Sequence, residues 1–84
     1  MKAANETLAA FRDDGEALED RRIFVRNLGW LLSQTREDVI GCELVSEKPD
    51  EEYVAITFKG DYQRLVNVHM DSYAAIVRDV AKAI

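Results

Sequence analysis

Cysteine, histidine, proline and tryptophan each occur only once in this chain of 84 residues. The single thiol, Cys42, can form neither an intramolecular disulfide nor a cysteine-rich zinc site, which agrees with a reducing compartment. The four glycines do not form the runs that bind phosphates or dinucleotides. We therefore expect neither a cofactor nor a metal ion.

Long apolar segments are also lacking. No apolar run approaches the ~18 residues that a membrane-spanning helix needs. The first residues, MKAANETLAAFRDD, contain no apolar core of the kind found in signal peptides. We expect a cytoplasmic protein that does not bind membranes.

Basic residues are too few for a nucleic-acid surface. Eleven lysines and arginines are scattered among sixteen acids, and the net charge is −5, whereas phosphate contacts require a basic face. The acids form two clusters, which could be ordinary solvated surface or a docking patch for a basic partner. They comprise Asp13, Asp14, Glu16, Glu19, Asp20, Glu47, Asp50, Glu51 and Glu52.

The first third of the chain has the periodicity of a helix. From Asn5, a suitable N-cap, to Thr35, a seam of residues recurs at alternate spacings of three and four: Leu8, Phe11, Gly15, Leu18, Arg22, Val25, Gly29 and Leu32. Ile23, Phe24, Leu28, Trp30 and Leu31 lie off this seam, so the second half of the helix must be covered on two sides. Either the helix breaks near Gly15, or it projects and pairs with another chain.

Three segments then alternate with a period of two, over about 39–46, 52–59 and 64–70. Their short polar connections, with Pro49 and Gly60 as turn residues, predict an antiparallel meander. A wholly apolar inner face fixes the expected register. It pairs Leu44 with Val54, Cys42 with Ile56, Ile40 with Phe58, Phe58 with Val66, Ile56 with Val68 and Val54 with Met70.

The chain ends in an amphipathic helix over about 72–83. Asp71 or Ser72 can cap its first turn, and Lys82 suits the helix dipole at its end. The predicted fold is thus a single α+β domain over 1–84. It has two layers in the order α-β-β-β-α, and the long N-terminal helix and the short C-terminal helix cover one face of the three-stranded meander.

The C-terminal segment VNVHMDSYAAIVRDVAKAI, a strand followed directly by Asp-Ser and an apolar helix, resembles the ends of small proteins encoded in bacterial prophages and other mobile elements. The resemblance covers residues 66–84. It implies a mobile-element origin, and it assigns no functional role to any residue.

Candidates for catalysis are few. His69 and Asp71 have a spacing that could supply two metal ligands, with Glu43 on the same predicted sheet face. Ser72 lacks the G-x-S-x-G turn of a hydrolase, and Cys42 is expected to face the core as a small hydrophobe. A small metal-dependent or acid/base enzyme remains the alternative from this class, but we expect no enzyme, because so small a domain has little volume for a substrate cleft.

Interaction surfaces are better supported by the sequence. The third strand is an edge without lysine or proline, and the outer sheet face has a floor of small residues. The expected interface residues are Trp30, Tyr53, Leu65, Asn67 and His69. We expect a protein–protein interaction module that forms a homodimer. The alternative is an acidic inhibitor that occupies the nucleic-acid groove of another protein.

Overall fold

The elements follow one another in the order expected from the sequence: a helix, three strands and a second helix. The computed structural model describes residues 14–84, with side chains from Ala17 onwards. Its elements are α1 (Asp14–Thr35), β1 (Val39–Val45), β2 (Tyr53–Phe58), β3 (Tyr62–Asn67) and α2 (Tyr73–Lys82). Gly15 is helical, whereas the predicted helical residues 5–13, including the Asn5 cap, lie outside the described residues.

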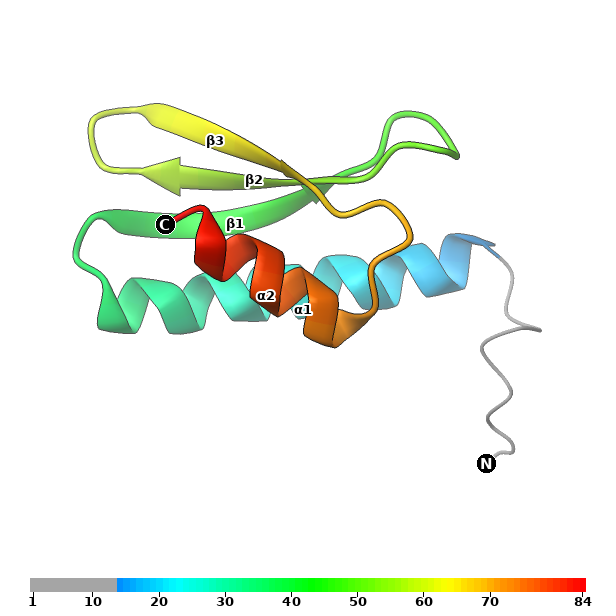
Figure 1. Cartoon of the computed structure of the whole chain (residues 1–84), viewed down its shortest axis with the longest axis horizontal. Helices are drawn as coiled ribbons and strands as arrows, with labels where there is room; N and C mark the ends of the chain where they lie inside the picture. Colours follow the sequence, from blue (N-terminus) through cyan, green and yellow to red (C-terminus); the bar gives the residue numbers. More distant parts are fainter. Residues whose placement is uncertain (1–13) are drawn as a thin grey trace.

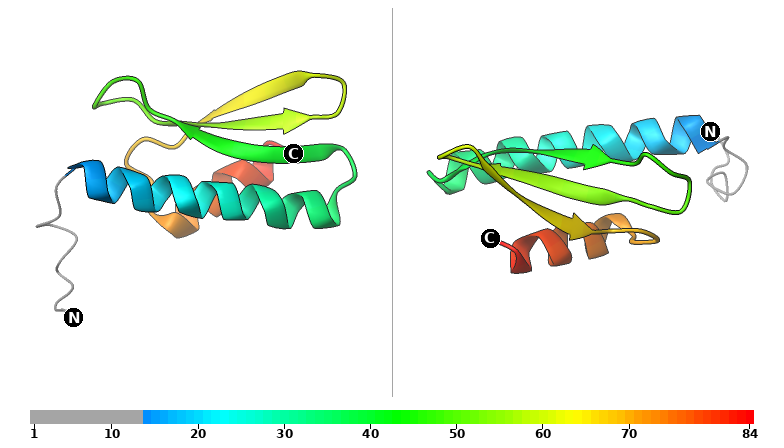
Figure 2. Two further views of the ribbon diagram at one scale, coloured as in Figure 1. Left: turned by 180° about the vertical axis from the view of Figure 1, so that it is seen from behind. Right: turned by 90° about the horizontal axis from the view of Figure 1, so that it is seen from above.

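The molecule has two layers, a sheet and a pair of helices. The strands form an antiparallel sheet in the order β1-β2-β3. Both helices lie beneath the same face, α1 under β1 and α2 on the β3 side (Figure 1; Figure 2). This confirms the predicted fold. Between the layers lies the core of Val25, Val39, Cys42, Leu44, Val54, Ile56, Phe58, Val68, Ile76 and Val80.

The layers approach each other most closely where Gly29 of α1 meets Cys42 of β1. A Cβ atom placed on Gly29 would lie 2.3 Å from the backbone nitrogen of Cys42, so only glycine fits there. Val25, one turn earlier, is fully buried, and Leu18 and Leu32 pack against the core. The predicted seam of α1 therefore faces the sheet.

The apolar residues of α1 that lie off the seam divide into two groups. Phe24 and Leu28 are partly buried against the core, whereas Ile23, Trp30 and Leu31 are exposed. Within residues 14–84, therefore, the second half of α1 is covered on one side, not on the two sides expected. Neither described helix has the length and apolarity needed to cross a membrane.

A bulge changes one end of the β1–β2 register. The pairs Leu44–Val54 and Cys42–Ile56 form as predicted, but Val39, not Ile40, lies opposite Phe58. The irregularity falls between Val39 and Gly41, and a bulge inserts an extra residue that the ladder does not pair. Ile40 is consequently 54% exposed instead of facing the core.

The β2–β3 hairpin is tighter than expected. Tyr62 instead of Val66 lies opposite Phe58, a shift of four residues, and Arg64 and Val66 lie opposite Ile56 and Val54. Gly60 and Asp61 both have positive φ angles, of 95° and 63°, and such left-handed residues permit a short connection. The predicted pairs of Val66, Val68 and Met70 are therefore wrong.

Because the register of β3 shifts by an even number of residues, each of its side chains stays on the sheet face that was predicted for it. Val66 still faces the helices, and Val68 is buried just beyond the strand. Met70, which was expected to face the core, has left the sheet and is 85% exposed. The start of α2 agrees with the prediction, since the Ser72 side chain accepts a hydrogen bond from the Ala75 amide at 3.1 Å.

Candidate interaction surface

The sheet face opposite the helices is lined by alternate residues of all three strands. By the observed register these are Gly41, Glu43, Val45, Tyr53, Ala55, Thr57, Gln63, Leu65 and Asn67. A Cβ atom on Gly41 would meet nothing within 4 Å. In the part of the chain that the structure describes, no helix lies over this face (Figure 2). It is a shallow floor of small residues with Leu65, 61% exposed, at its β3 border.

β3 is an edge strand whose residues are nearly all exposed. The Val68 amide donates to the Glu52 carbonyl at 2.9 Å, so the backbone of Val68 points toward β2. Because the backbone direction alternates along an antiparallel strand, Val66, Arg64 and Tyr62 also point toward β2. The amides and carbonyls of Gln63, Leu65 and Asn67 therefore point to the open edge.

The two edges of the sheet differ. β1 carries the bulge beside Ile40 and an exposed charge at Glu43, two features that oppose pairing with another strand. The charge in β3 is directed under the sheet, because Arg64 Nη1 donates to the Ala83 carbonyl and the guanidinium lies 5.7 Å from the centre of the Phe58 ring. The edge of β3 thus lacks the protection that β1 has.

The structure brings together three of the five expected interface residues. Tyr53, Leu65 and Asn67 share the outer sheet face. Trp30 lies apart from them on α1, 62% exposed, where it helps to line a hollow of about 370 Å³ beside β1. His69 lies beyond the end of β3, not opposite Ala55 as the predicted register required, and its backbone amide donates to Asn67 Oδ1 at 2.9 Å.

The two acidic clusters lie at the same end of the molecule, on the N-terminal half of α1 and on the β1–β2 loop (Figure 1). Glu19, Glu47 and Asp50 are exposed, and Asp20 and Glu51 are half-buried. Asp13 and the side chains of Asp14 and Glu16 lie outside the described residues. Glu52 does not belong to a free acidic patch, because it forms an ion pair with Arg21.

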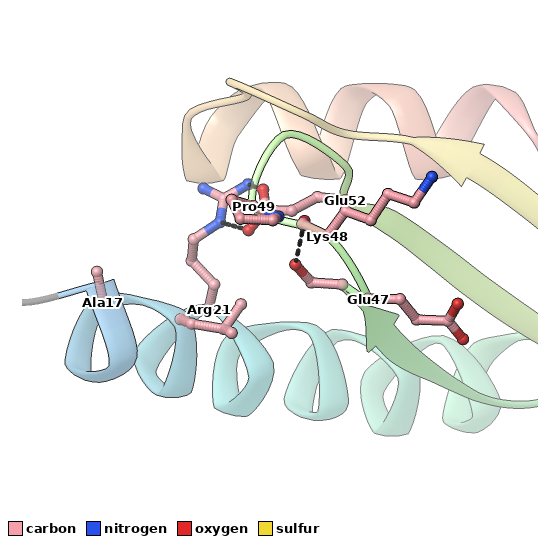
Figure 3. Close-up of a pocket in the computed structure, with 8 residues that line it drawn as sticks. Ala17, Arg21, Glu47, Lys48, Pro49 and Glu52 are labelled. Carbon is pink, nitrogen blue, oxygen red and sulfur yellow. Dashed lines mark hydrogen bonds and ion pairs between the residues drawn. The ribbon is translucent and has the colours of Figure 1, made fainter.

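Arg21 joins three parts of the fold at a hollow of about 490 Å³ between α1 and the β1–β2 loop (Figure 3). Its Nε and Nη2 donate to the two carboxylate oxygens of Glu52 at 3.0 and 2.6 Å. Nη1 and Nη2 also donate to the carbonyls of Asp71 and Val68 at 2.7 and 3.2 Å. Both side chains of the pair are mostly buried, so this arrangement is structural.

No role for Arg21 follows from the sequence alone. Arg22 lies on the predicted helix seam, and the spacing of a helix allows either of the two adjacent arginines to precede Val25 on the buried face. Which of the two arginines is buried depends on the position of the acid that pairs with it, and that position does not follow from the pattern of the helix. That acid, Glu52, comes from a loop at a distance of 31 residues.

Asp71, just before α2, and Asp79, within α2, form a pair of carboxyl groups. The hydrogen bond with Asp79, followed by desolvation, raises the pKa of Asp71, whereas the hydrogen bond from Arg78 and then that with Asp71 lower the pKa of Asp79. Asp71 Oδ2 is shielded from solvent and has no donor among the described residues. When Asp71 is protonated, its hydroxyl can donate to the Asp79 carboxylate.

Asp71→Asn is expected to stabilise the protein at neutral pH. A raised folded pKa means that the contribution of Asp71 to stability is present below its unfolded pKa and is lost as the pH rises through the folded value. An asparagine amide can donate to Asp79 at every pH. Thermal unfolding should therefore show a gain of a few degrees in Tm at pH 7 and almost none at pH 3.

The exposed loop variant Asp50→Asn removes the same charge and is the control, with little expected change at either pH. An equal gain for Asp71→Asn at both pH values, or a loss at pH 7, would show that the carboxyl pair does not limit stability.

Cys42 faces the core as predicted, and burial raises the pKa of its thiol to about 11. At neutral pH it is therefore protonated and poorly nucleophilic. Among the described side chains, from Ala17 to Ile84, no three histidine, cysteine or acidic side chains are grouped so that they could hold a metal ion.

Comparison with known proteins identifies no relative: no family model matches the chain, and no curated protein or solved structure shows significant similarity to it.

Proposed function

We propose that this protein is a non-enzymatic protein–protein interaction module that works as a homodimer. The observation that carries the proposal is the one-sided covering of the sheet: within residues 14–84, both helices occupy one face, and the other face and the β3 edge have no element over them (Figure 2). Exposed Leu65 and half-buried Tyr53 lie on that face. An unprotected edge strand is a template for pairing with another strand.

The size of the domain supports self-association. A chain of this length buries only about 60 to 65% of its unfolded surface when it folds, so a partner subunit adds apolar burial that one core cannot supply. The hollow beside Arg21 is a weaker candidate for a binding site, because Arg21 and Glu52 already form hydrogen bonds with each other there. Binding through the edge of β3 uses backbone amides and carbonyls that pair with no other strand of the described chain.

Light scattering after size exclusion, over a hundredfold range of protein concentration, tests the proposal. We expect a mass twice the 9.5 kDa of one chain at micromolar concentration, with dissociation on dilution. A mass of one chain throughout the range would contradict the homodimer.

If the protein is instead an acidic inhibitor, reversing the charge of its acidic clusters should abolish binding to a basic partner. Reversing Glu47 and Asp50 to lysine changes the exposed loop charges without touching the sheet, so the dimer mass should persist. If the same reversal dissociated the dimer, the acidic end of the molecule, not the sheet, would be the contact.

A further inference from the structure

We infer that two copies of this chain pair through β3, antiparallel, with Leu65 opposite Leu65 of the second copy, to form one continuous six-stranded sheet. This inference rests on the proposed function and specifies its surface and its register. It follows from the direction of the backbone, the charges along β3 and the hydrogen bonds of two amide side chains.

The backbone of β3 is suited to pairing with itself. Gln63, Leu65 and Asn67 direct their amides and carbonyls to the open edge, as deduced from the Val68–Glu52 hydrogen bond. A two-fold axis at Leu65 places Leu65 opposite its own copy and Gln63 opposite Asn67. Each open-edge residue then lies opposite an open-edge residue of the second copy, so their backbone amides and carbonyls can all form hydrogen bonds between the two strands.

Neighbouring registers are less favourable. A two-fold axis must keep the two faces of the sheet aligned, so the centre can move to Arg64 or to Val66 but not between residues. A centre at Arg64 puts Asn67 opposite Asp61, which lies outside β3. A centre at Val66 puts Gln63 opposite His69, which lies beyond the end of β3.

The side chains of Gln63 and Asn67 have complementary hydrogen-bonding groups for this register. Gln63 Nε2 donates to Thr57 Oγ1 at 3.0 Å, which leaves its Oε1 as the acceptor. Asn67 Oδ1 accepts from the His69 amide, which leaves its Nδ2 as the donor. Across the two-fold axis, each asparagine can therefore donate to a glutamine that needs a donor.

The proposed sheet has a measurable geometry. Glu43, Ala55 and Leu65 lie opposite one another in a row across the three strands. With strands about 4.8 Å apart, pairing at Leu65 places the two Leu65 Cα atoms about 5 Å apart and the two Glu43 Cα atoms about 24 Å apart. Pairing through β1 would exchange these two distances.

Nitroxide labels at these two positions decide between the arrangements. Full-length Leu65→Cys and Glu43→Cys proteins are each labelled, and the unsubstituted protein controls for reaction at buried Cys42. After the mass of each labelled protein is checked, we expect strong dipolar broadening for position 65. Pulsed dipolar spectroscopy should give a distance near 24 Å, widened by the linker, for position 43.

Other outcomes overturn the inference in separable ways. A dimer with the two distances exchanged uses β1, and a dimer with both distances short packs its outer faces together. Either result rejects the β3 register and leaves the homodimer standing. A monomer in the unlabelled protein at every concentration rejects the proposed function itself.

Leu65→Asp tests the same contact without a label. It places two carboxylates opposite each other at the two-fold axis, and the dimer dissociation constant should rise at least about tenfold. Leu31→Asp is the matched control, because Leu31 is 56% exposed but lies on α1. If Leu31→Asp dissociates the dimer and Leu65→Asp does not, the contact is helical and the inference is wrong.

Discussion

Gly29→Ala should destabilise the protein by about 2 to 3 kcal/mol, although alanine is the better helix former by about 1 kcal/mol. The new Cβ atom would lie 2.3 Å from the backbone nitrogen of Cys42 and 2.8 Å from its Cβ atom. Backbone atoms in the middle of a strand have little room to move, so α1 must shift away from β1. Urea unfolding followed by circular dichroism measures the loss.

Gly41→Ala is the matched control. It makes the same change in the adjacent strand, where the added Cβ atom meets nothing within 4 Å. Its effect should be neutral or slightly stabilising, because alanine restricts the unfolded chain. If the two variants lost stability equally, the close approach of helix and sheet would not be what requires glycine at position 29.

Arg21→Met is expected to cost about 2 to 3 kcal/mol, less than the 3 to 5 kcal/mol typical of fully buried pairs. The variant removes both hydrogen bonds to Glu52 and those to the carbonyls of Val68 and Asp71. It leaves a mostly buried carboxylate without its cation. Urea unfolding at pH 7 provides the measurement, and adding Glu52→Leu should restore part of the loss.

Arg36→Met distinguishes this effect from the loss of any arginine. Arg36 also holds a carboxylate, that of Asp38, through two hydrogen bonds, but these side chains are 42% and 48% exposed, far more than those of Arg21 and Glu52. Exposed pairs contribute little, so its stability should be close to that of the unchanged protein. A loss as large as that of Arg21→Met would mean that burial is not what makes the Arg21 pair important.

Periodicity predicts the fold because burial has a different repeat in each element. The alternation in Val54, Ile56 and Phe58 predicts the inner face of the middle strand, and the spacing of Val25 and Gly29 predicts the face of α1 that meets it. Both of these predictions use only the spacing of the residues that face the core. The inner positions of β1, apart from the bulge at Ile40, follow for the same reason.

Turn conformation is less accessible from the sequence. The pattern of Val66, Val68 and Met70 continues beyond the last paired residue, so apolar alternation alone extends the strand too far. The positive φ angle of Asp61 shortens the hairpin, and an aspartate does not require that conformation in the way that glycine favours it. The candidate interaction surface was therefore predicted in composition, whereas its register depended on the turn.

The hydrogen bonds of Arg21 join residues 31, 47 and 50 positions apart along the chain. Bringing such distant segments together costs conformational entropy that increases with the length of the loop, whereas the hairpin contacts close far shorter loops. We therefore expect the arginine pair to form late in folding. Interactions absent from the transition state slow unfolding without accelerating folding, so Arg21→Met should shorten the lifetime of the folded chain and leave its rate of folding almost unchanged.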